Sequence, residues 1–135
     1  MNETLLTWIV FILTFGGVVL IHEFGHFIAA RLSGIEVEEF GIGLPTPGAL
    51  TLFTWKGTRF TLNWLPLGGF VRPKGENDPN IPGGLAAASP WKRLFVLFAG
   101  PFMNLASWRW IRATFAPRSR ISPKSSTTVG HSASQ

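Results

Sequence analysis

The first constraint on the fold is an apolar run from Leu5 to Ile21 that holds seventeen residues and no charge. With the helix-compatible residues that follow, it is long enough to cross the roughly 30 Å hydrocarbon core of a bilayer. The sequence therefore predicts a transmembrane helix from about Thr4 to Leu32. A secretory signal peptide is the alternative. Its positively charged start is missing, because Glu3 is the only charge before the run ends, and no small-residue cleavage site follows.

A His-Glu-x-x-His motif at positions 22–26 follows directly on this run. On a helix, His22 and His26 lie about 40° apart around the axis and roughly 6 Å apart along it, so both imidazoles can reach one zinc ion. Zinc lowers the pKa of a coordinated water to about 7, and Glu23 can take the proton of that water as hydroxide attacks a carbonyl. Ionisable groups at the end of a spanning helix are costly and mark function. The motif predicts zinc, with His22 and His26 as ligands and Glu23 as catalytic general base.

The chain has no cysteine and a formal net charge of +5. Without thiolates, a metal must be held by histidine and carboxylate groups. The basic residues are scattered between apolar segments and do not form the clustered stripe that a phosphate-binding face needs, which argues against a nucleic-acid partner. They fit the surface of a lipid bilayer better.

The middle of the chain changes character. Two segments rich in Thr, Phe, Leu and Trp, Leu50–Trp55 and Arg59–Trp64, predict strands joined by a turn at Lys56-Gly57. Both carry apolar groups on both faces, which fits a hairpin in the membrane or against helices better than a one-sided soluble sheet. Glycines and prolines predict helix breaks in Ile35–Gly48 and turns in Leu65–Val71.

A second helix is predicted to begin at Ser89 or Pro90. Its apolar run, Leu94–Ala106, is about 20 Å long and too short to span a membrane alone. From Ser107 to Gln135 the chain holds seven serines, five basic residues and no acid, which predicts a disordered tail in which His131 is an incidental solvated residue. The expected organisation is one membrane domain over residues 1–106, mainly α, followed by the tail over 107–135.

Four motifs in order resemble the amino-terminal part of the site-2 protease family of intramembrane zinc metalloproteases, in particular its bacterial regulated-proteolysis branch. The resemblance covers about Leu5 to Leu105, through HEFGH at 22–26, FGIG at 40–43, PLGGFV at 66–71 and FAGPFMN at 98–104. It implies an integral protein of the bacterial inner membrane. Its water-accessible site would cleave a transmembrane segment of a partner protein.

The resemblance also implies roles for the other motifs. A substrate helix must unwind before its carbonyls can be attacked, and an exposed edge of the membrane-associated hairpin can pair with the unwound segment. Ordinary packing against helices is the alternative for the hairpin. Gly41, Gly43 and Asn104 become substrate-binding or site-supporting residues by similarity, with helix packing as the alternative for Asn104.

The sequence departs from the family pattern in its metal ligands. Zinc sites of this kind use three protein ligands, and the family takes the third from an aspartate on a later helix. The one aspartate here, Asp78, lies in a polar loop and is not assigned to the metal. The family's later helices and its peptide-binding domain are also missing, as a truncation or a shifted reading frame would leave the chain.

Three rival readings stay open at this stage. The first is a catalytically inactive membrane fragment of such a protease. The second is a soluble zinc peptidase, which the uncharged run before His22 disfavours. The third is a binding module without a metal.

Overall fold

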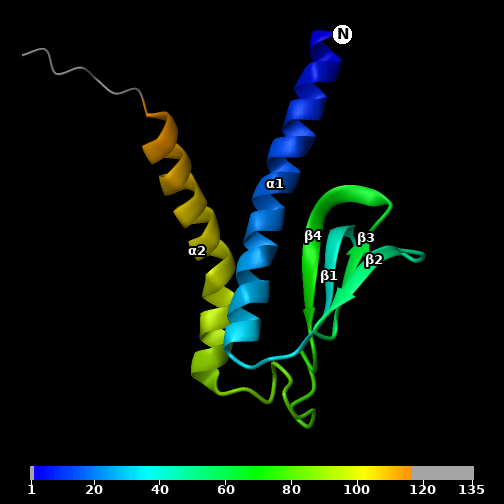
Figure 1. Ribbon diagram of the computed structural model, residues 1–135, viewed down its shortest axis with the longest axis vertical. Coiled ribbons are helices and arrows are strands. Elements are labelled where there is room, and N and C mark those ends of the chain that lie inside the picture. Colours follow the sequence, from blue (N-terminus) through cyan, green and yellow to red (C-terminus); the bar gives the residue numbers. More distant parts are fainter. Residues whose placement is uncertain (1, 117–135) are drawn as a thin grey trace, which may run out of the picture.

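The computed structural model describes residues 2–116, apart from the side chain of Pro66, and contains two helices and a four-stranded sheet (Figure 1). In chain order the elements are α1 (Glu3–Leu32), β1 (Val37–Leu44), β2 (Leu50–Trp55), β3 (Thr58–Leu62), β4 (Leu65–Pro73) and α2 (Pro90–Phe115). Helix α1 packs against both α2 and β4, and the two helices run in opposite directions and diverge away from their contact (Figure 1). The first helix therefore joins both halves of the fold.

Helix α1 confirms the helix predicted from the apolar run. Within residues 2–116 it is the one helix long and apolar enough to cross a membrane. Core helices of soluble proteins also meet that criterion, but they are mostly buried, whereas none of the most apolar 18-residue stretch of α1 is buried. Its amino-terminal part exposes large apolar side chains, among them Trp8, Phe11 and Leu13.

The sheet has the order β2-β3-β1-β4, with β1 parallel to β3 and antiparallel to β4. Strands β2 and β3 form the predicted hairpin. Its turn has positive φ at both Lys56 and Gly57, 47° and 83°, which is the backbone of the tight turns that match the twist of paired strands. The prediction of a hairpin alone is wrong, however, because β1 and β4 complete a four-stranded sheet.

Strand β1 is not predicted from the sequence because it contains two glycines, which are uncommon inside strands. Gly41 lies under the Phe70 ring of β4, and a Cβ at Gly41 would overlap that ring. Gly43 adopts a φ of 89° beside an irregularity in the β1–β4 register, and a Cβ there would collide with the Leu65 carbonyl. These residues are close-approach positions inside a sheet and do not break it.

The buried core lies where the carboxyl-terminal half of α1 meets the sheet and α2. It consists of Phe27, Ala29, Ala30, Ile35, Val37, Phe40 and Val96. Phe27 contacts Phe40 and Phe60 edge to face, with ring centroids 5.6 and 5.8 Å apart. This aromatic contact fixes the sheet against the turn of α1 that follows the histidines.

One charged side chain, Glu39, is buried within the sheet. Its carboxylate accepts a hydrogen bond from Thr61 Oγ1 at 2.8 Å and pairs with Arg72 at 3.0 Å and Arg59 at 3.4 Å. The three partners come from β3 and β4, the two neighbours of β1. Because a buried charge needs such partners, Glu39 ties the three strands together.

Helix α2 begins at Pro90, as predicted, but continues to Phe115. The expected end of the helix near Ala106, and disorder beginning at Ser107, are therefore wrong. Ser107 Oγ donates to the Met103 carbonyl at 2.8 Å, so the serine is accommodated within the helix. The helix ends just before Pro117, since the residue that precedes a proline disfavours helical backbone. Residues 117–135, His131 included, lie outside the described residues.

Candidate metal centre

The site forms where α1 and α2 are in contact, at the turn that carries the His-Glu-x-x-His motif. Gly25 is buried there, and a Cβ on it would lie 2.5 Å from the Ala99 carbonyl oxygen and 2.9 Å from Met103 Cβ. The two backbones can approach this closely because Gly25 has no side chain. The second helix thereby comes within reach of both histidine rings.

The two histidine rings converge. His22 Nε2 and His26 Nε2 are 3.1 Å apart, and the rings meet nearly edge to face with their centroids 4.7 Å apart. Two imidazole ligands of a tetrahedral zinc, each about 2.0–2.1 Å from the metal, have nitrogens about 3.3 Å apart. The separation of the two Nε2 atoms therefore fits a shared zinc ion.

The second ring nitrogen of each histidine meets a group on α2. His26 Nδ1 is 2.7 Å from the Val96 carbonyl oxygen, and His22 Nδ1 is 3.3 Å from Asn104 Nδ2. Metal-binding histidines usually have such a partner, which holds the ring orientation. Asn104 thus lies against the site, as its expected supporting role requires.

Space for an ion is left by Gly100, one turn before Asn104 on α2. A Cβ on Gly100 would collide with His26 Nε2 and lie 2.7 Å from His22 Nε2. A side chain of any size would therefore fill the region that the two Nε2 atoms face. Gly100 belongs to the FAGPFMN motif, but the sequence alone does not predict its role, since that role depends on contacts between distant segments.

Glu23 lies on the side of α1 that meets the sheet. A Cβ on Gly69 of β4 would lie 3.6 Å from Glu23 Cγ and 2.9 Å from Leu20 Cδ2, so the missing side chain lets β4 approach this turn. Among the described residues Glu23 has no hydrogen-bond or ion-pair partner, and it is half-buried. Its carboxylate is therefore not engaged by another side chain of the described fold.

The described residues bring together two candidate ligands, His22 and His26, and no third. No group of three or more His, Cys, Asp or Glu side chains that could hold a metal occurs within residues 2–116. Asp78 lies in the loop between β4 and α2, where its Oδ1 accepts hydrogen bonds from Asn80 N at 2.9 Å and Asn80 Nδ2 at 3.0 Å. The donor set fits zinc in type and spacing, and it needs a further ligand.

Gly41 and Gly43, the other predicted site-supporting residues, lie in β1. Gly69, which contacts α1, is on the neighbouring strand β4 and pairs in register with Ile42. Gly41 and Gly43 are therefore one strand away from the strand that approaches Glu23. Their lack of side chains is explained by the close approach of Phe70 to Gly41 and of Leu65 to Gly43.

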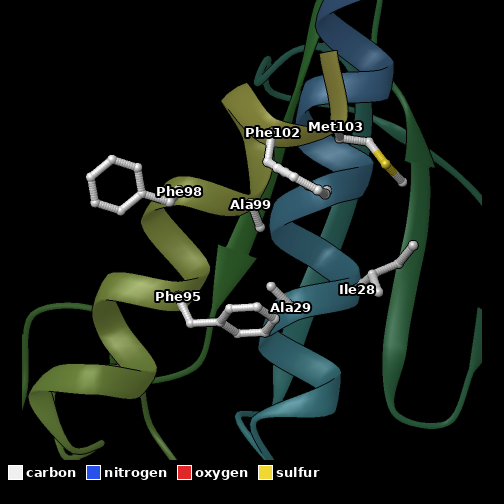
Figure 2. Close-up of a pocket in the computed structure, with 8 residues that line it drawn as sticks. Ile28, Ala29, Phe95, Phe98, Ala99, Phe102 and Met103 are labelled. Carbon is white, nitrogen blue, oxygen red and sulfur yellow. The ribbon is translucent and has the colours of Figure 1, made fainter. Parts of the chain in front are cut away.

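An apolar groove of about 400 Å³ runs beside the site between α1 and α2 (Figure 2). It is lined by Gly25, Ile28, Ala29, Phe95, Phe98, Ala99, Phe102 and Met103. Figure 2 shows the Phe95 ring of α2 directed toward Ala29 of α1. The lining lacks His22, Glu23 and His26, so the groove adjoins the metal centre without containing it.

A helix that presents His-Glu-x-x-His, with both histidines converging on one point, defines the class of zinc metalloproteases. Residues 10–111 match peptidase family M50. The chain belongs to this family, the site-2 proteases, as the motifs predicted.

The chain is similar to several bacterial proteins that bear the name of candidate zinc metalloproteases. One from Campylobacter jejuni is 42% identical over 101 residues, which cover 70% of this chain and 27% of the relative. Another, from Clostridium perfringens, is 45% identical over 96 residues, covering 69% and 28%. A third, from Chlamydia trachomatis, is 38% identical over 115 residues, covering 76% and 18%. The chain therefore spans less than a third of the length of these relatives.

Proposed function

We propose that this chain forms the metal-binding part of a zinc endopeptidase that hydrolyses peptide bonds in membrane-spanning substrates. The observation that carries the proposal is the convergence of His22 Nε2 and His26 Nε2 across the space left by Gly100. Zinc held there would polarise a substrate carbonyl and lower the pKa of a bound water to about 7. Glu23, adjacent in the chain and unpaired among the described residues, takes the proton of the attacking water and delivers it to the leaving amine.

The proposed location is a lipid bilayer, and specifically the inner membrane of a bacterium. Support comes from the exposed apolar surface of α1, which would be costly in water over such a length. The three relatives described above are bacterial proteins. A soluble zinc peptidase would bury the helix that carries its motif, so the exposure of α1 disfavours that alternative.

The proposed substrate-binding element is the β2 edge of the sheet. All six residues of β2 are exposed, and β2 is the outermost strand next to β3. An unwound stretch of a substrate helix exposes backbone N–H and C=O groups that need partners, and such an edge supplies them. The partner protein is therefore a transmembrane substrate with a segment that can adopt extended backbone.

A second candidate function applies to the isolated polypeptide, because only two ligands are available. In this candidate the polypeptide is a membrane protein that binds zinc weakly and does not cleave peptide bonds. Zinc in catalytic sites is held by three protein ligands, and the described residues provide two. A third ligand must then come from another segment or another polypeptide. The two candidates share the same metal centre and differ in turnover.

The metal centre is tested by metal analysis of the purified 135-residue chain in detergent. Replacing both His22 and His26 by Ala is expected to reduce bound zinc at least about tenfold, because no imidazole remains on that face of α1. His131→Ala is the matched control and should keep the zinc content of the parent. Equal zinc stoichiometry in the parent and the double variant would contradict the ligand assignment.

A separate prediction concerns the orientation of α1 in the membrane. No Lys or Arg precedes α1, whereas seven lie between its last turn and the first turn of α2: Arg31, Lys56, Arg59, Arg72, Lys74, Lys92 and Arg93. Because basic residues favour the cytoplasmic side, the amino terminus is expected to face outward. The chain has no cysteine, so single cysteines at Asn2 and Asn77 can be labelled with a membrane-impermeant reagent in intact cells. Preferential labelling at position 2 is expected, and preferential labelling at position 77 would refute the orientation.

A further inference from the structure

We propose that Asn104 is a positioning residue that holds the His22 ring and sets its tautomer, so that His22 Nε2 can face the metal. The proposal rests on the proposed zinc site. It is carried by the hydrogen bonds that link α1 to α2 at the two histidines.

The tautomer of His26 is fixed by the backbone of α2. The Val96 carbonyl oxygen, 2.7 Å from His26 Nδ1, can only accept a hydrogen bond. His26 Nδ1 therefore carries the proton, and in the neutral ring Nε2 keeps its lone pair. This nitrogen is ready to bind a metal whatever the state of His22.

The tautomer of His22 is not fixed in this way, because its partner is a side-chain amide. An amide can donate through its nitrogen or accept through its oxygen, and a 180° rotation about the last side-chain bond exchanges the two. His22 Nδ1, 3.3 Å from the Asn104 amide, can therefore be either acceptor or donor. Each orientation of Asn104 selects a different tautomer of His22.

When Asn104 Nδ2 donates to His22 Nδ1, the proton of His22 lies on Nε2. That Nε2–H then donates to the lone pair of His26 Nε2, 3.1 Å away. The two histidines bond to each other, and a proton occupies the direction in which a metal would bind. In this orientation Asn104 Oδ1 is buried and has no hydrogen-bond partner among the described residues.

When the amide is reversed, Asn104 Oδ1 accepts the proton of His22 Nδ1. Both Nε2 lone pairs then face each other 3.1 Å apart, an arrangement that is repulsive unless a cation lies between them. The reversal gives the buried oxygen a partner and puts Asn104 Nδ2 in the buried position that the oxygen held. An oxygen acceptor at position 104 should therefore favour zinc binding by His22 Nε2.

Two variants separate the acceptor role from helix packing. Asn104→Asp keeps an oxygen acceptor and removes the N–H donor, whereas Asn104→Leu keeps the approximate shape and removes both. Ser107→Ala is the matched control. It also removes one hydrogen bond of a polar side chain in α2, but that bond runs to the Met103 carbonyl and not to a histidine. Zinc affinity is measured by competition with a chromogenic chelator on the full 135-residue chain in detergent.

Asn104→Leu is expected to bind zinc about 10- to 100-fold more weakly than the parent, as losses of such supporting partners typically do. Asn104→Asp and Ser107→Ala are expected to stay within about threefold of the parent, since both keep an acceptor for His22 Nδ1. Equal affinity of the parent and Asn104→Leu would overturn the proposal. A loss in Asn104→Asp as large as that in Asn104→Leu would also overturn it.

Nitrogen NMR of His22 gives a readout that helix packing alone would not move. In metal-free protein, His22 Nδ1 is expected to be unprotonated in the parent and protonated in Asn104→Asp. Identical ring nitrogen shifts in the parent, Asn104→Asp and Asn104→Leu would show that Asn104 does not set the tautomer. Absence of zinc binding by the parent itself would refute the proposed metal centre, a result distinct from failure of the Asn104 variants alone.

Discussion

Replacing Glu23 by Gln in a complete M50 protease that carries this segment is expected to lower peptide cleavage by about 100- to 10,000-fold while zinc remains bound. The amide has nearly the shape of the carboxylate, but it cannot accept the proton of the attacking water. Glu23 lies beside His22 in α1 and has no ion-pair partner among residues 2–116, so its charge is not needed to hold the described fold together. The loss should therefore appear in turnover, with little change in stability.

The measurement is cleavage of a transmembrane substrate by the enzyme in proteoliposomes, with zinc content determined on the same samples. Glu38→Gln is the matched control, because Glu38 is an exposed glutamate of β1 and undergoes the same chemical change. Residual activity within about tenfold of the parent would remove Glu23 from the role of general base. In the same assay the 135-residue chain alone is expected to give no Glu23-dependent cleavage, since its described residues hold only two of three ligands.

Gly100→Ala is expected to weaken zinc binding by more than about 100-fold, a larger effect than the loss of a supporting hydrogen bond. The added Cβ would collide with His26 Nε2 and lie 2.7 Å from His22 Nε2. These atoms are the ends of side chains, so the rings can swing aside and relieve the collision. They can do so only by giving up the convergence that fits a metal.

The control for Gly100→Ala is Gly17→Ala in α1, because a Cβ on Gly17 would meet nothing within 4 Å. Both changes replace a helical glycine by the better helix former, so any gain in helix propensity is shared. Zinc affinity by chelator competition should separate the two variants, while circular dichroism should show helix in both. Parent-like zinc affinity in Gly100→Ala would mean that the ion, if bound, lies away from this face of α2.

The sequence allowed prediction of the features that depend on local pattern. The uncharged run predicted α1, the four-residue spacing placed His22 and His26 on one face, and Lys56-Gly57 predicted the β2–β3 turn. The four motifs in order predicted the family. Each of these predictions uses residues that are close together in the sequence, or motifs that can be matched directly to those of a known family.

The features that were missed depend on contacts between distant segments. Strands β1 and β4 contain glycines, which usually weaken strands, and the reasons for them are contacts with distant residues, such as the Phe70 ring over Gly41. The partner of His26 is the backbone carbonyl of Val96, which no side chain in the sequence could reveal. The composition changes at Ser107 but α2 continues to Phe115, so composition alone predicts the wrong end for this helix.

The separation in sequence between the histidines and their partners has a consequence for biosynthesis. Val96 follows His26 by 70 residues, and Asn104 follows His22 by 82. At translation rates of about 5–20 residues per second, the ribosome needs about 4 to 16 s to make the residues between His22 and Asn104. During that interval the nascent chain holds two imidazoles and one carboxylate on an apolar helix without the second helix that orients them. An ordered pair of histidines can therefore form only after α2 has arrived, which makes the pairing of α1 with α2 the step that starts maturation of the proposed site.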